Sequence, residues 1–184
     1  MLTASGLTKS FGPRTLFTNV SLQLGPSRRI ALIGSNGTGK TTLLEILTGL
    51  QEADAGEIHK PQEMKIGYLP QELQTSKGKN VLQEVLSGAE DTNQLATQLK
   101  KLSLELEKVN GEDKSELISE FGEAQSRFEQ IGGYAIEAEA HRLLSGLGFK
   151  THDHNRDIGE LSGGWQMRVA LARLLLSKPD LLIL

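Results

Sequence analysis

Short apolar runs separated by turn residues fill the first third of the chain, a pattern that predicts strands. The predicted strands span residues 2–7, 17–24, 29–33, 57–59 and 65–69. Residues 29–33 form an unbroken apolar run after the arginine, which is typical of a buried strand. Residues 42–47 instead repeat apolar positions at helical spacing, and Gly49 is placed to cap that helix. A strand, a glycine-rich loop and a helix are therefore predicted in direct succession.

The middle of the chain carries apolar residues at alternating spacings of four and three. The two stripes are Leu95, Leu99, Leu102, Leu106 and Val109, then Leu117, Phe121, Ala124, Phe128 and Ile131. Residues 110–113, which include a glycine, separate the stripes. This arrangement predicts an antiparallel helical hairpin packed along its own seam, each helix having about 19 residues and a length of roughly 28 Å. A short helix that opens with a capping box at residues 80–83 is predicted before it.

Two further helices are predicted near the end of the sequence. Residues 136–147 have an amphipathic pattern, and residues 165–177 are apolar on nearly every side, which predicts a buried helix. Residues 151–160, between the two helices, are polar and loop-like. Pro179 ends the last helix, and residues 180–184 begin a buried strand, so we expect the sequence to be a fragment of a longer protein.

The glycine-rich loop at residues 34–41, GSNGTGKT, fits the pattern G-x-x-x-x-G-K-[ST]. A loop between a strand and a helix directs several backbone N–H groups at one phosphate. Lys40 strengthens this interpretation, because a cation in the first turn of a helix opposes the helix dipole unless an anion is bound there. The expected nucleotide-binding residues are Gly34, Ser35, Asn36, Gly37, Thr38, Gly39, Lys40, Thr41 and Thr42. We call residues 34–41 the phosphate loop.

A second candidate site is formed by Ser162, Gly163 and Gly164, which open the helix predicted near residue 165. Ser162 is a suitable N-cap, but each glycine in a helix costs about 1 kcal/mol relative to alanine. The two glycines are explained if bare backbone amides must approach an anion closely. An ordinary junction between a loop and a helix is the alternative interpretation.

Composition narrows the class of protein. The chain has 184 residues, a net charge of −3 and no cysteine, so it shows no general preference for nucleic acid and suits the cytoplasm. The N-terminus lacks the features of a signal peptide, and no apolar run approaches the roughly 20 residues of a membrane helix. We therefore expect a soluble, cytoplasmic protein that reaches a membrane only through a partner.

The ordered motifs resemble those of an ATP-binding-cassette (ABC) ATPase. They are the phosphate loop, YLPQ at 68–71, LSGGWQ at 161–166 and LLIL at 181–184. The resemblance implies an α/β P-loop NTPase of the ABC type, with an antiparallel β subdomain, a parallel core sheet that is incomplete here, and a helical subdomain carrying a coiled-coil hairpin. It assigns residues 1–72 and 161–184 to the ATP-binding core and residues 73–160 to the helical subdomain, including a hairpin arm at 90–131.

The resemblance also implies a role for single residues. Phe11 would stack on adenine, Lys40 would bind the β- and γ-phosphates of ATP, and Thr41 would hold Mg²⁺. Gln71 would contact the metal and position the attacking water, which is a catalytic role. From the residues alone, Phe11 is equally explained as a core aromatic and Gln71 as a solvated loop residue.

ABC ATPases bind the nucleotide between two cassettes, so Ser162, Gly163 and Gly164 would contact the γ-phosphate held by a second cassette. That partner would lie in the same longer chain or in a homodimer. The Asp-Glu pair that supplies the metal-binding carboxylate and the catalytic base in the family is absent from this sequence. We therefore expect the intact protein to be an ATPase, and the 184-residue chain to bind ATP weakly at best without hydrolysing it.

The hairpin arm and Trp165 resemble those of the ABC-F proteins, which carry two cassettes and no membrane domain. Those proteins act on the ribosome as translation factors or antibiotic-protection factors, so the resemblance implies an N-terminal cassette with a ribosomal partner. The charge of the arm gives no support for RNA binding, because residues 90–131 contain ten acidic and five basic residues.

Two other functions remain open from the sequence. One is the ATPase subunit of a membrane transporter, which would need a coupling surface near Gln71 for a membrane subunit. The other is a non-catalytic, ATP-gated interaction module. The histidines add little, because His152, Asp153 and His154 lie in a polar loop and are better explained as solvated residues than as a metal site.

Overall fold

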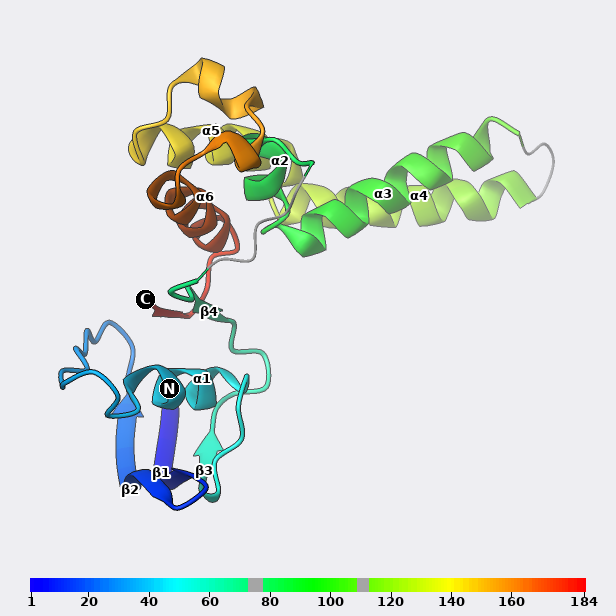
Figure 1. Cartoon of the computed structure of the whole chain (residues 1–184). Coiled ribbons are helices and arrows are strands. Elements are labelled where there is room, and N and C mark those ends of the chain that lie inside the picture. Colours follow the sequence, from blue (N-terminus) through cyan, green and yellow to red (C-terminus); the bar gives the residue numbers. More distant parts are fainter. Residues whose placement is uncertain (73–77, 109–112) are drawn as a thin grey trace. The chain divides into compact units, whose positions relative to one another are not determined.

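The computed structural model describes residues 1–72, 78–108 and 113–184, and it divides into two compact units (Figure 1). The first unit comprises Met1–Tyr68 and Pro179–Leu184, and the second comprises Leu69–Lys178. Each unit has its own hydrophobic core, so each is described by itself. Val109 and residues 110–112 of the predicted hairpin lie outside the described residues.

The first unit contains a three-stranded antiparallel sheet with the order β2-β1-β3. The strands are β1 (Leu2–Phe11), β2 (Arg14–Leu24) and β3 (Ala55–His59), and the helix α1 spans Lys40–Thr48. Alternate residues of β1 and one face of α1 form the buried core: Leu2, Ala4, Leu7, Leu43, Ile46 and Leu47, together with Ile183. The predicted strands at 2–7 and 17–24 are confirmed, and both extend further than the sequence pattern indicated.

A parallel pair of strands, β4 (Ile66–Tyr68) and β5 (Leu181–Ile183), belongs to the same unit. The Asp180 carboxylate accepts a hydrogen bond from the Lys65 backbone N–H at 2.8 Å, which fixes the start of the pairing. The two strands are the predicted parallel core sheet in its shortest form. The α/β class with separate antiparallel and parallel sheets is thus confirmed.

The predicted strand at residues 29–33 is wrong. These residues have no regular secondary structure, and the Ile33 side chain is 90% exposed. A strand needs hydrogen-bonded neighbours, and among the described residues neither sheet extends to this segment. The apolar run therefore has the composition of a buried strand without the pairing that would bury it.

The second unit is built around three helices, α2 (Val81–Leu86), α5 (Ile136–Gly146) and α6 (Gly163–Leu176). Asn80 and Gln83 form the predicted capping box of α2, with bonds of 2.8 and 3.1 Å. The helix α6 begins two residues earlier than predicted and buries one face only, through Val169, Ala172 and Leu176. It is therefore not a fully buried helix.

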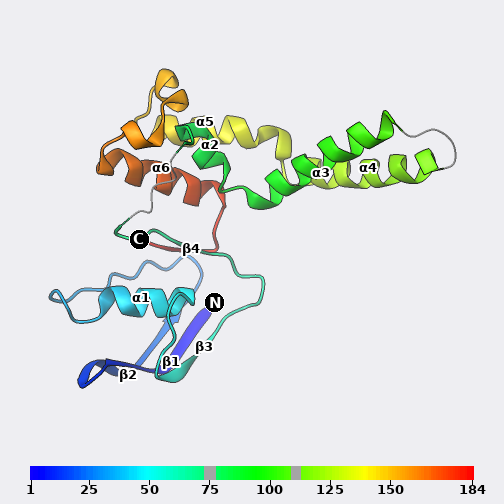
Figure 2. The same cartoon turned by 45° about the vertical axis from the view of Figure 1, so that its right-hand side comes forward.

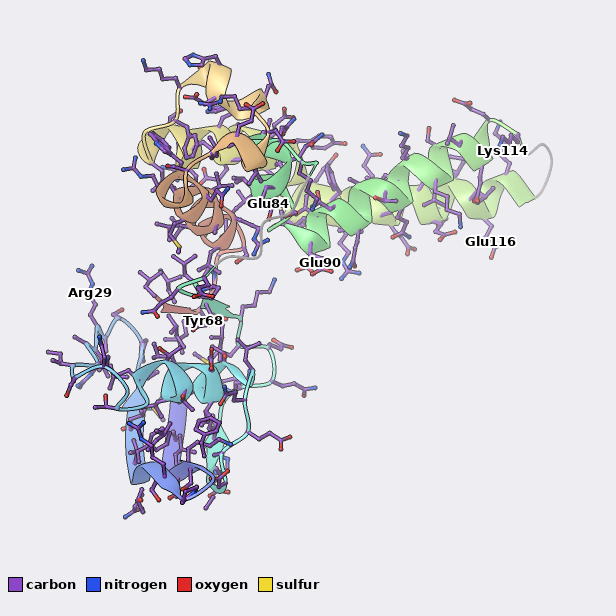
Figure 3. The ribbon with its side chains drawn as sticks, viewed as in Figure 1. Arg29, Tyr68, Glu84, Glu90, Lys114 and Glu116 are labelled. Carbon is purple, nitrogen blue, oxygen red and sulfur yellow. The ribbon has the colours of Figure 1, made fainter. Side chains whose placement is uncertain are left out.

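An ion pair with a buried carboxylate, Glu84, and a half-exposed Arg173 joins α2 to α6. The Arg173 Nη1 atom donates to Glu84 Oε1 at 2.6 Å, and the Lys79 Nζ atom lies 3.6 Å from Glu84 Oε2. Figure 3 labels Glu84 within this cluster of helices. A buried carboxylate that lost these partners would be strongly destabilising, so the pair favours one packing of α2 against α6.

The predicted hairpin is confirmed over the described residues. The helices α3 (Glu90–Leu106) and α4 (Asp113–Gln130) run side by side in both views and extend away from α2, α5 and α6 (Figures 1 and 2). Among its seam residues Leu95, Leu102, Ala124 and Phe128 are buried. Ile131 is an exception, because α4 ends at Gln130 and the Ile131 side chain is exposed.

The compact units differ from the predicted domain boundaries over residues 69–72 and 161–178. The prediction places both segments in the ATP-binding core, whereas both belong to the second unit, where α6 packs on α2 and α5. The functional boundaries themselves stay a prediction. None of the described helices is both long enough and apolar enough to span a bilayer.

The segment 151–160 is more structured than predicted. It forms two short 3₁₀ helices, η2 (Thr151–Asn155) and η3 (Ile158–Glu160). His154 is only 3% exposed, and its Nδ1 atom lies 2.7 Å from the Nδ1 atom of His141 in α5. The two rings stack at a centroid distance of 4.8 Å. Burial and this stacking make His154 part of the packing between η2 and α5. Among the described residues no group of three or more His, Asp or Glu side chains is arranged to hold a metal ion.

This histidine pair predicts a pH-dependent stability. Burial chiefly, and then the nearby His141, lower the pKa of His154, while Asp153 acts in the opposite direction. The unfolded chain therefore takes up a proton more readily than the folded chain, and stability is lost as the pH falls below about 6.5. Other charged groups at this site are Glu137 beside His141, and His152 and Arg156 beside Asp153.

We expect amide hydrogen exchange in α5 and η2 to accelerate between pH 7.5 and 5.5, after correction for the intrinsic exchange rate. The substitution His154→Leu should remove most of this acceleration, because it removes the group that must titrate. An equal acceleration in His154→Leu would contradict this account. His59→Leu, which changes an exposed histidine of the first unit, is the matched control.

Candidate nucleotide-binding site

The N-terminus of α1 has no neutralising group of its own. Its N-cap is Gly39, in the left-handed conformation with φ of 90°, and no side chain caps the helix. The first turn contains no acidic residue, and its first residue is Lys40. Free N–H groups, the positive end of the helix dipole and an ammonium group therefore coincide at one point, which favours the binding of an anion.

The phosphate loop is exposed and is closed by its own polar groups. The Lys40 Nζ atom donates to the backbone oxygens of Gly34 and Ser35 at 2.8 and 2.9 Å. The Thr38 hydroxyl donates to the Ser35 oxygen at 2.9 Å. The Lys40 side chain thus folds back over its own loop. Its ammonium group is bound by neutral carbonyls, and a phosphate would be a stronger hydrogen-bond acceptor than these.

The hairpin of β1 and β2 supports the loop from one side. A Cβ atom added at Gly39 would lie 3.1 Å from side-chain atoms of Leu16 and Phe17, so these side chains of β2 would have to move slightly to admit any larger residue. The Arg14 Nη2 atom donates to the Gly37 backbone oxygen at 2.9 Å. Sequence reasoning missed Arg14, because an arginine beside a turn is no different in pattern from a solvated one.

Phe11 is the last residue of β1 and is 52% exposed. The alternative interpretation of Phe11 as a core aromatic is therefore wrong. The Lys9 Nζ atom lies 5.6 Å from the centre of its ring and is held by Asp54 at 3.1 Å. That lysine and the Ser10 backbone N–H keep the pKa of Asp54 below its usual range, so the carboxylate stays ionised. The exposed ring is available to stack on a ligand.

The structure places the other predicted residues without testing their roles. Thr41 and Thr42 lie in the first turn of α1, where Thr41 is exposed and Thr42 is partly exposed. Gln71 is also exposed and lies three residues after the end of β4, but it belongs to the second unit. The arrangement of Gln71 relative to the phosphate loop therefore stays a prediction.

Ser162, Gly163 and Gly164 form the exposed start of α6. Ser162 is the N-cap, and its backbone oxygen accepts from the Trp165 and Gln166 N–H groups at 2.9 and 3.0 Å. The Ser162 hydroxyl makes no capping bond, and the first turn of α6 contains no acidic residue. No atom lies within 4 Å of a Cβ added at Gly163 or Gly164. Among the described residues no contact requires glycine at these two positions.

Trp165 is fixed beside this helix start by two neighbours. Its ring contacts Phe149 in a T-shaped arrangement at 4.8 Å, and the Arg168 guanidinium lies 4.6 Å from its centre. Arg168 also donates to the Leu147 oxygen at 3.1 Å. These contacts anchor the signature segment, residues 161–166, to the loop that follows α5. Arg168 was not predicted, and only the spacing of three from Trp165 could have indicated it.

A phosphate loop at an uncapped helix N-terminus, beside separate antiparallel and parallel sheets, defines the chain as a P-loop nucleotide-binding protein. The family described as "ABC transporter" matches residues 17–184. The chain therefore belongs to the ABC transporter family and is an ATP-binding cassette.

The relatives include a member of the ABC transporter F family and two proteins with functional names. The chain is 35% identical over 182 residues to ABC transporter F family member 2 of Arabidopsis thaliana, covering 97% of this chain and 27% of that protein. It is 33% identical over 184 residues to the tylosin resistance ATP-binding protein TlrC of Streptomyces fradiae, covering 100% and 34%. It is 34% identical over 173 residues to the energy-dependent translational throttle protein EttA of Escherichia coli, covering 93% and 30%.

Solved structures agree on the fold. A dimeric cassette, MJ0796, in a post-hydrolysis state with ADP and Pi superimposes with a TM-score of 0.61 at 20% identity, covering 99% of this chain and 72% of that one. At this identity the likeness concerns the fold alone. The chain spans about a third or less of the three relatives above, so the activity of the whole protein is a matter for proposal.

The open space around Gly163 yields a stability prediction. Gly163→Ala should leave the melting temperature unchanged or raise it, because alanine is better than glycine in a helix by up to about 1 kcal/mol. Gly39→Ala is the matched contrast. It should destabilise the first unit by about 1–2 kcal/mol, because φ is 90° there and Leu16 and Phe17 crowd the new methyl group. Thermal unfolding of both variants measures the difference in stability. Equal destabilisation by the two substitutions would contradict the conclusion that the chain itself requires glycine at Gly39 and not at Gly163.

Proposed function

We propose that the intact protein binds ATP with Mg²⁺ and hydrolyses it as an ABC-F type ATPase that acts on the ribosome. The observation that carries ATP binding is the N-terminus of α1, which combines an uncapped helix end with Lys40 and no acidic residue. Membership of the ABC transporter family supports the nucleotide class. The ribosomal role is the more specific part of the proposal, and it is supported by the hairpin arm and by the named relatives.

Within the first unit, each proposed role follows from position. Lys40 exchanges the carbonyls of Gly34 and Ser35 for the β- and γ-phosphates, and the amides of the phosphate loop bind the same oxygens. Thr41 presents an exposed hydroxyl in the first turn of α1, and this oxygen donor suits Mg²⁺, which would neutralise charge on the phosphates. Phe11 offers an exposed ring for the adenine.

The remaining roles lie in the second unit. We assign Gln71 to the orientation of the attacking water and the metal, since it is exposed and lies three residues after the end of β4. We assign Ser162, Gly163 and Gly164 to the γ-phosphate bound by a second cassette. The open space at both glycines and the free Ser162 hydroxyl support this assignment, because an incoming phosphate would fill the space. No residue of the sequence is assigned as the catalytic base.

Support for the ribosome comes from the hairpin arm and from the relatives. The arm extends away from α2, α5 and α6 within the second unit (Figure 2). Its seam residues Leu95, Leu102, Ala124 and Phe128 are buried. One relative is named a translational throttle protein and another a tylosin resistance protein, and both names fit factors that act on translation. The acidic excess of the arm gives no support for direct RNA binding, so contact through ribosomal protein is equally consistent.

The second candidate function is the ATPase subunit of a membrane transporter. The description of the matching family as "ABC transporter" favours it. That description does not account for the long hairpin arm. An ATP-gated module without hydrolysis is the third candidate, and it predicts nucleotide binding with no release of phosphate.

The intact protein should co-sediment with ribosomes in the presence of ATP when hydrolysis is blocked, and it should release phosphate from ATP when hydrolysis is allowed. Lys40→Ala should weaken ATP binding by at least about tenfold and abolish both behaviours, because the site loses its charged hydrogen bonds to phosphate. Lys60→Ala, which changes an exposed lysine outside the phosphate loop, is the control. A protein that hydrolyses ATP but stays in the supernatant would contradict the ribosomal role and leave the transporter subunit.

A further inference from the structure

The turn between β1 and β2 is attached to the phosphate loop through Arg14. Its Nη2 atom donates to the Gly37 backbone oxygen at 2.9 Å, at a residue whose φ is 78°. Among the residues that the structure describes, Arg14 forms no ion pair with a carboxylate. The guanidinium therefore binds the backbone of the loop, although Arg14 lies on the exposed surface.

This contact has a consequence for the direction of one loop amide. The peptide unit that joins Gly37 to Thr38 is planar and trans, so its C=O and N–H groups point in opposite directions. When Arg14 holds the Gly37 oxygen on the side of the hairpin, the Thr38 N–H must point to the other side. Thr38 is itself held by the bond of its hydroxyl to the Ser35 oxygen. Both ends of this peptide unit are thus fixed before any ligand arrives.

The same turn carries the exposed aromatic ring. Phe11 and Arg14 are directly paired across the β1–β2 turn, with Gly12 in the left-handed conformation between them. On the proposed function, on which this inference rests, the ring faces the adenine and the loop faces the phosphates. One short turn therefore holds both ends of the nucleotide site in a fixed relation.

We propose that Arg14 is a positioning residue for ATP binding, which orients the Thr38 amide by holding the Gly37 carbonyl. It acts on the loop and not on the nucleotide. Because the same oriented amide serves ATP and ADP, the loss of Arg14 weakens both nucleotides by a similar factor. A guanidinium that bound the γ-phosphate directly would instead affect ATP far more than ADP.

The test uses the intact protein and two substitutions of similar length. Arg14→Met keeps the aliphatic stem and removes the donor, whereas Arg14→Lys keeps a donor that can reach the same carbonyl. Arg29→Met removes the same charge from a side chain that points away from the ribbon (Figure 3) and is the matched control. Binding of ATP and of ADP is measured by calorimetry with Mg²⁺ present, with Lys40→Ala as a reference.

We expect Arg14→Met to raise both dissociation constants by about five- to tenfold, the effect of one charged hydrogen bond at an exposed site. Arg14→Lys should recover most of this loss, and Arg29→Met should bind as the unsubstituted protein does. Before any nucleotide is added, the Thr38 amide resonance should move in Arg14→Met and stay in place in Arg29→Met. The melting temperature without nucleotide should not change, which a purely structural role would not allow.

Three results would overturn the inference. The first is binding by Arg14→Met that equals binding by Arg29→Met, and the second is a loss confined to ATP. The third is a Thr38 amide that does not respond to Arg14→Met in the absence of nucleotide. If Lys40→Ala binds ATP as well as the unsubstituted protein, the proposed function fails together with this inference. If only Lys40→Ala is impaired, the proposed function stands and Arg14 has no positioning role.

Discussion

The N-terminus of α1 is the constraint on which the first unit depends. The helix begins with free N–H groups and Lys40, without a capping side chain or an acidic residue. One face of α1 is buried in the core through Leu43, Ile46 and Leu47, and this packing holds the helix in its orientation. The backbone oxygens of the loop hold the ammonium in the structure. These neutral oxygens stabilise the positive end of the helix only in part, and a bound phosphate would supply the missing negative charge.

Among the described residues, α1 and α6 both begin without a capping side chain or an acidic residue in the first turn, and they differ in how glycine is used. At Gly39 the glycine is required by the chain itself, because φ is 90° and β2 occupies the space. At Gly163 the described chain imposes no such requirement. The glycine of the first helix start is therefore explained by contacts within its own unit, whereas we propose that the glycines of the second serve a phosphate bound by a second cassette. This difference is the physical basis for proposing that the cassette works with a second one.

The sequence predicted features that depend on local pattern and missed those that depend on distant neighbours. The phosphate loop and the hairpin seam follow from residues close in the chain, and Leu95 and Leu102 are buried as their spacing predicts. The run at 29–33 failed because a parallel strand exists only with its partners. His154 was expected in solvent, but a ring from α5 covers it. Arg14 could not be identified, since its role is a contact across 23 residues.

The central claim is that the phosphate loop binds ATP at the N-terminus of α1. The most direct measurement is the change in backbone amide resonances of the protein on titration with ATP and Mg²⁺. The account predicts the largest changes at Gly37, Thr38, Gly39, Lys40 and Thr41, and little change in the core of α5. Resonances at the start of α1 that stay in place at saturating ATP would contradict it.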